Sequence, residues 1–167
     1  ADGNAEFNRK LDQKLKGIED FILIGGPPCQ AYSLAGRSRM LGVGRKISDP
    51  ESTSSKDLRA QLASEFYKDK RHTLYLEYLN ILCRYQPAVF VMENVKGMLK
   101  YAQQVKEDIE QIGNNNNNNM SYEIGFKILV SDDFGIAQKR PRLFFIGIRK
   151  DVVKSKKISP EIIFNKI

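Results

Sequence analysis

Three short segments of this 167-residue chain carry residue types that covalent catalysis needs. Cys29 follows two glycines and two prolines at the end of an apolar run, and a thiolate exposed on such a turn is a strong nucleophile once positive charge stabilises it. Glu93 could donate or hold a proton on the group under attack. Arg140 and Arg142 alternate as in an extended segment, which places both guanidinium groups on one face.

Each of these segments also has a structural interpretation, and the residues alone leave both open. A cysteine is most often a small core residue, and Glu93 could be a solvated strand-end carboxylate or a cap on the following helix. The two arginines could protect an edge strand from aggregation. A thiol redox enzyme or a cysteine hydrolase is disfavoured, because neither a resolving cysteine nor a histidine base accompanies Cys29.

The elements that must position these residues follow an α/β order. The expected strands are residues 20–24, 88–92, 122–130 and 142–148, and the expected helices lie within residues 57–85 and 97–112. The first two strands are continuous apolar runs, which are typical of buried parallel strands joined by a right-handed crossover. Because ligands bind beyond the carboxyl ends of such strands, we expect Cys29 and Glu93 to meet in one cleft.

Composition narrows the class of partner. A formal net charge of +7 and an isoelectric point near 9.4 favour an anionic partner, most often nucleic acid. Two cysteines form no disulfide framework and no metal-ligand spacing, so we expect a reducing cytoplasmic setting and no metal. We expect no membrane span or secretion signal. Residues 37–56 are expected to form a mobile loop, and the asparagine-rich run 114–119 an exposed connector.

Taken together, the three segments resemble the central motifs of DNA cytosine-5 methyltransferases. The matching residues are Pro28-Cys29-Gln30 with Ser33, Glu93-Asn94-Val95 with Gly97, and Gln138-x-Arg140-x-Arg142. The likeness covers about residues 20–149. It implies the Rossmann-like α/β fold of S-adenosyl-L-methionine-dependent methyltransferases, a mostly parallel mixed sheet with flanking helices, of which this chain holds part.

The resemblance also implies a mechanism. Cys29 would attack C6 of a cytosine flipped out of double-stranded DNA, since C6 is shielded inside the base stack. Glu93 would contact the N3 and N4 edge, and C5 would then take the methyl group of S-adenosyl-L-methionine. Arg142, with Arg140, would bind a phosphate or base oxygen near the nucleophile.

Further residues acquire expected roles by the same resemblance. The expected substrate-binding residues are Pro28, Gln30, Ser33, Arg37, Asn94 and Gln138, and Pro28 is also expected beside the cofactor. Basic side chains of the 37–56 loop suit the phosphate backbone, where contacts give affinity rather than sequence choice.

Two parts of the family pattern are missing from the sequence. No Phe-x-Gly-x-Gly motif and no acidic residue after a second strand are present to hold the cofactor, and no target-recognition region follows Arg149. We therefore expect residues 1–167 to be a partial catalytic domain that is inactive alone, from a bacterial restriction-modification or orphan enzyme acting in the cytoplasm or on the nucleoid. A transfer RNA cytosine-5 methyltransferase and a non-catalytic nucleic-acid-binding module remain alternatives. The sequence predicts no oligomeric state.

Overall fold

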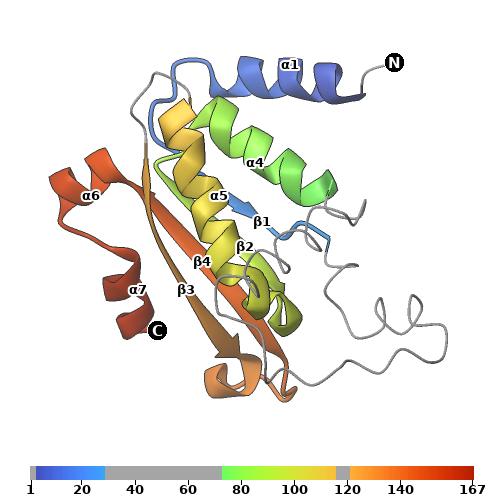
Figure 1. The fold of residues 1–167 in the computed structure, drawn as a ribbon, viewed down its shortest axis with the longest axis vertical. Helices are drawn as coiled ribbons and strands as arrows, with labels where there is room; N and C mark the ends of the chain where they lie inside the picture. The colour runs from blue at the N-terminus through green and yellow to red at the C-terminus, as the bar shows by residue number, and fades with distance from the viewer. Residues whose placement is uncertain (1–2, 29–72, 116–120) are drawn as a thin grey trace, which may run out of the picture.

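The computed structural model describes residues 3–28, 73–115 and 121–167. Its strands form one four-stranded sheet in the order β1-β2-β4-β3 (Figure 1). The strands are β1 (Ile22–Gly25), β2 (Val89–Val95), β3 (Tyr122–Val130) and β4 (Pro141–Arg149). The α-helices are α1 (Gly3–Leu15), α4 (Thr73–Tyr85), α5 (Ala102–Asn115), α6 (Lys150–Lys156) and α7 (Pro160–Lys166), and the 3₁₀-helices are η2 (Lys96–Tyr101) and η3 (Ser131–Phe134).

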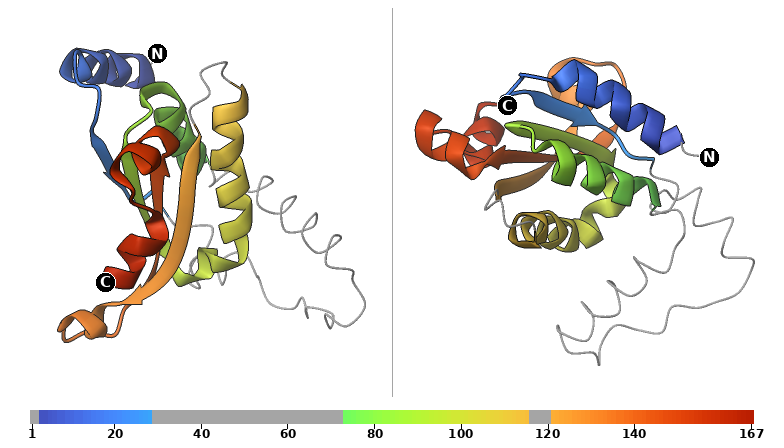
Figure 2. Two further views of the ribbon diagram at one scale, coloured as in Figure 1. Left: turned by 90° about the vertical axis from the view of Figure 1, so that its left-hand side faces the viewer. Right: turned by 90° about the horizontal axis from the view of Figure 1, so that it is seen from above.

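Helices cover both faces of the sheet (Figure 2). Helices α4 and α5 lie on one face, over a core that includes Phe90 and Phe145. Helices α6 and α7 lie on the other, against Ile146 and Ile148. Alternate residues of β2 and β4 supply the two cores, as the two-residue period of a strand requires. None of the helices in the described residues could span a lipid bilayer.

Most of the expected elements are present, with three differences. The expected helix of residues 97–112 is the 3₁₀-helix η2 followed by α5. Strand β2 runs on to Val95, so Glu93 and Asn94 belong to the strand rather than following it. The expectation of a mostly parallel sheet is wrong for the described strands, since β1 and β2 are parallel but β4 is antiparallel to both β2 and β3. The short 131–140 connection between β3 and β4 allows only an antiparallel pair, because a parallel pair needs a long crossover.

Arg149 ties the chain together at the end of the sheet opposite the 131–140 turn. Its guanidinium is ion-paired with Asp20 and with Asp151, both at 2.8 Å, and donates to the Gln86 carbonyl at 2.9 Å. The hydrogen bond from Arg149 holds the pKa of the Asp151 carboxyl below its usual value. These bonds fix the start of β1 against the end of β4 and leave the far end of the sheet for the site.

A glycine in β4 makes room for an aromatic ring of the core. A Cβ at Gly147 would lie 1.9 Å from Cε1 of Phe90, a fully buried ring that packs edge-on against Tyr122. We therefore expect Gly147→Ala to destabilise the chain by about 3 kcal/mol, because an overpacked core must displace its neighbours. Urea unfolding measures this loss, with exposed Lys154→Ala as the control. Equal midpoints for the two variants would contradict the packing shown here.

Candidate active site

An ion pair joins two of the expected catalytic side chains. Glu93 of β2 and Arg142 of β4 lie on the same face of the sheet, in the register that pairs Glu93 with Phe144 and Val95 with Arg142. Arg142 Nε lies 2.7 Å from Glu93 Oε1, with side-chain exposures of 21% and 40%. A pair this exposed adds little stability, so its main effect is to fix the direction of the Glu93 carboxylate.

The chain leaving β1 passes directly over this carboxylate. A Cβ placed on Gly26 would lie 3.0 Å from Glu93 Oε2, so a residue with a side chain here would press on the carboxylate. A Cβ placed on Gly25 would lie 2.8 Å from Cε2 of Tyr78, whose hydroxyl donates to the Val91 carbonyl at 3.3 Å. The two glycines thus bring the β1 end against β2, as the expected cleft requires.

The side chain of Asn94 holds Pro27, the residue that follows Gly26. Its Nδ2 donates to the Pro27 carbonyl at 3.1 Å, and its Oδ1 accepts from the Val95 N–H at 2.9 Å. The Asn94 side chain is only 2% exposed. Both polar atoms of Asn94 are therefore bonded to the chain itself, which gives it a structural role, and its expected contact with substrate stays a prediction.

Replacing Asn94 should loosen the β1 end. We expect Asn94→Ala to lower the free energy of unfolding by about 2 kcal/mol, because the Pro27 carbonyl would lose its buried hydrogen-bond donor. Urea unfolding of the variant measures the loss, and exposed Asn80→Ala on α4 is a matched control with an expected change below about 0.5 kcal/mol. The bond would be unimportant if both variants unfolded at the same urea concentration.

Several expected site residues lie outside the described residues. These are Cys29, Gln30, Ser33 and Arg37, together with the 37–56 loop. Pro28 is exposed at the last described position before them. The backbone limits how far Cys29 can be, since its Cα lies at most about 11 Å from that of Gly26. Its distance from Glu93 stays a prediction.

The third motif lies in the turn between β3 and β4. Only Arg142 is in the strand, while Arg140 and Gln138 are exposed in the turn. The Ser131 hydroxyl donates to the Gln138 carbonyl and accepts from the Arg140 N–H at 3.0 Å. Sequence reasoning missed this role of Ser131, because a serine at the end of a strand has no distinctive pattern.

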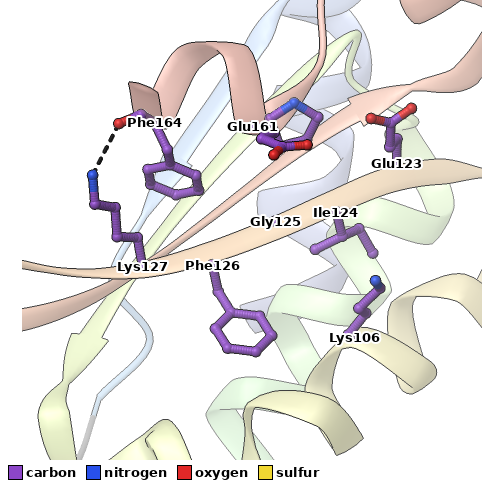
Figure 3. A pocket seen from close by; sticks show the side chains of 9 residues that line it. Lys106, Glu123, Ile124, Gly125, Phe126, Lys127, Glu161 and Phe164 are labelled. Atoms are coloured by element: carbon purple, nitrogen blue, oxygen red, sulfur yellow. Dashed lines mark hydrogen bonds between the residues drawn. The ribbon is translucent and has the colours of Figure 1, made fainter. Parts of the chain in front are cut away.

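A separate cavity of about 430 Å³ lies along β3, between α5 and α7 (Figure 3). Lys106, Glu123, Lys127 and Glu161 line it, and Lys127 Nζ donates to the Phe164 carbonyl at 3.0 Å. The charges of its two lysines and two glutamates cancel, and neither Glu93 nor Arg142 lines the cavity. This cavity is therefore not part of the ion-paired site. Within the described ranges, no group of three or more His, Cys, Asp or Glu side chains could hold a metal ion.

The described residues thus place an expected catalytic carboxylate and an expected arginine together at one end of the α/β sheet, next to the segment that leads to Cys29. A sequence profile of the C-5 cytosine-specific DNA methylases matches residues 62–166. The chain therefore belongs to the C-5 cytosine-specific DNA methylase family.

Two bacterial relatives illustrate the extent of the match. The chain is 37% identical over 135 residues to the type II methyltransferase M.Bpa9945I of Bacillus paralicheniformis, covering 77% of this chain and 25% of that protein. It is 36% identical over 132 residues to the type II methyltransferase M.FnuDI of Fusobacterium nucleatum, covering 78% of this chain and 29% of that protein. The chain thus spans about a quarter to a third of the length of these relatives.

A solved E. coli structure, described as a prophage-encoded DNA modification methyltransferase, shares the fold. The match has a TM-score of 0.50 at 24% identity and covers 86% of this chain and 31% of that one. The likeness supports the fold alone, and this chain again matches only part of a larger molecule.

Proposed function

We propose that the chain is the catalytic part of a DNA (cytosine-5)-methyltransferase. The observation that carries this proposal is the 2.7 Å ion pair between Arg142 and Glu93, directly under the Gly26 backbone that leads to Cys29. The family membership supplies the reaction class. The described residues bring the carboxyl group and the cation together, and the short segment from Gly26 limits how far the proposed nucleophile Cys29 can lie from them.

The chemistry assigns one task to each side chain. The Cys29 thiolate forms a bond to C6 of a flipped-out cytosine, and the electron pair of the C5–C6 double bond moves toward C5 while a proton is held at N3. Glu93 is the group that holds or delivers this proton. Arg142 is a positioning residue, because its guanidinium fixes the carboxylate. When bound to the intact enzyme, S-adenosyl-L-methionine would supply the methyl group for C5. Loss of the C5 proton would then restore the C5–C6 double bond and expel the Cys29 thiolate.

The cavity along β3 contains no residue of β1, so it gives no support to a cofactor site at the end of that strand. The expected role of Pro28 beside the cofactor has no further support from the described residues. We therefore propose that cofactor binding and target recognition come from other parts of a larger protein.

Strand β1 offers a surface for that larger part. Ile22 and Ile24 are 61% and 75% exposed, although they lie on the same face as Val89 and Val91 of the neighbouring strand. Exposed isoleucines on an outer strand favour coverage by another segment. We propose that the remainder of the enzyme covers this strand.

Ile24→Asp tests the coverage of β1. In the 167-residue chain the variant should change the free energy of unfolding by less than about 0.5 kcal/mol, because Ile24 is exposed. In the intact enzyme it should cost about 2 kcal/mol or more, because the same carboxylate would be buried without a partner. Thermal or urea unfolding of both lengths measures the difference. An equally small effect in the 167-residue chain and in the intact enzyme would contradict the proposal that another part of the enzyme covers β1.

Methyl transfer to two substrates tests the proposed function itself. The intact enzyme is incubated with radiolabelled S-adenosyl-L-methionine and either duplex DNA or transfer RNA. We expect label at C5 of cytosine in the duplex. Label in transfer RNA alone would favour the RNA methyltransferase, and binding of either nucleic acid without transfer would favour a non-catalytic module.

A further inference from the structure

The turn that carries Arg140 contains an apolar hollow beside the Glu93–Arg142 pair. The hollow has a volume of about 220 Å³, and its lining includes Leu129, Phe134, Ile136, Phe144 and both arginines. Phe134 and Ile136 remain 49% and 56% exposed. Because Arg142 lines the hollow and also pairs with Glu93, the hollow adjoins the catalytic site.

The backbone of the turn holds these apolar side chains in place. The Ser131 carbonyl accepts from the Ile136 N–H at 3.2 Å, and Gly135 adopts a left-handed conformation with φ of 76°. The Ser131 hydroxyl bridges Gln138 and Arg140. The hollow therefore exists before any ligand arrives, which lowers the entropic cost of binding.

The wall of the hollow is almost wholly apolar, and the charged groups of its arginines lie outside it, which favours a ligand with an apolar face and an anionic group beside that face. Arg142 is already paired with Glu93, whereas Arg140 has no ion pair to any described residue. Asp132 and Asp133 are exposed in the same turn but do not line the hollow. A nucleotide has both features, since its base stacks on aromatic side chains and its phosphate pairs with arginine. An apolar peptide would leave the arginine unused, and a simple anion would leave the apolar wall unused.

We propose that this hollow binds one unpaired nucleotide of the DNA substrate. This nucleotide is not the cytosine that Cys29 attacks. The base lies against Phe134 and Ile136, and the phosphate pairs with Arg140. This inference rests on the proposed function, because an enzyme that flips bases exposes unpaired nucleotides next to its site.

The test separates base contacts from phosphate contacts. Fluorescence anisotropy measures the affinity of the 167-residue chain, at low salt, for labelled oligodeoxythymidylate of about twelve nucleotides and for an abasic strand of equal length. Phe134→Ala should weaken binding of the first strand about tenfold and leave the abasic strand unchanged. Phe134→Tyr should restore the affinity. Phe7→Ala on α1 is the matched control, because Phe7 is also 49% exposed.

Arg140→Ala should weaken the binding of both strands equally. It should also reduce the slope of log affinity against log salt concentration by about 0.7. Equal losses on both strands with Phe134→Ala would overturn the base contact while leaving the proposed function intact. Failure of the unaltered chain to bind either strand would overturn the inference and would also count against a nucleic-acid substrate.

Discussion

Cys29→Ser in the intact enzyme is expected to lower the rate of methyl transfer at least about a thousandfold. Residues that act together in catalysis lose most of their effect when the nucleophile among them is removed. A serine hydroxyl is much less acidic than a thiol and has no base beside it in the motif, so it does not attack C6 at a useful rate. Transfer of a radiolabelled methyl group to duplex DNA measures the loss.

The chain supplies its own control for this experiment. Cys83, the other cysteine, lies half-buried in α4 and away from the ion pair, so Cys83→Ser should keep nearly full activity. DNA affinity should be largely unchanged in both variants, since phosphate contacts supply most of it. Substantial turnover by Cys29→Ser would remove Cys29 from the proposed role.

Glu93→Gln is expected to slow the covalent step by about a hundredfold to ten thousandfold, because an amide cannot transfer the proton that the attacked ring requires. The variant should fold normally. Glutamine still offers an oxygen to Arg142, and the lost ion pair is partly exposed and contributes little to stability. Single-turnover kinetics with the intact enzyme measure the step separately from product release.

A carboxylate elsewhere in the chain controls for the charge change. Glu161→Gln on α7 removes one exposed negative charge, and the single-turnover rate should stay within about twofold of the unaltered enzyme, since surface substitutions act weakly. If Glu93→Gln reacted as fast as this control, Glu93 would be a structural residue that only holds Arg142 in place.

The strands were predictable from the sequence because their apolar runs end at glycine and proline. The run that ends at Gly25 and the pair of strands around the 131–140 turn lie close to where periodicity places them. The end of β2 was not predictable, because Glu93 and Asn94 are polar and hydropathy stops at Met92. Tertiary pairing with β4 carries the strand on to Val95.

The site was predictable only where a motif carries reactive side chains. Glu93 and Arg142 stand 49 positions apart in the sequence, and the β2–β4 pairing brings them to 2.7 Å. The support from Asn94 and Ser131 was not predictable, since hydrogen bonds to the backbone depend on where distant segments run. Helices α1, α6 and α7 were also missed. The sequence of α1 is mostly polar, whereas α6 and α7 are short and their apolar residues pack only on the finished sheet.

The most direct test of the central claim is denaturing intact-mass spectrometry of the enzyme with S-adenosyl-L-methionine and a duplex that carries 5-fluorocytosine. The fluorine blocks loss of the C5 substituent, so the covalent intermediate accumulates. We predict a species with the mass of protein plus methylated DNA strand, absent from Cys29→Ser. Methylation of the ordinary duplex without any such adduct would contradict covalent catalysis by Cys29.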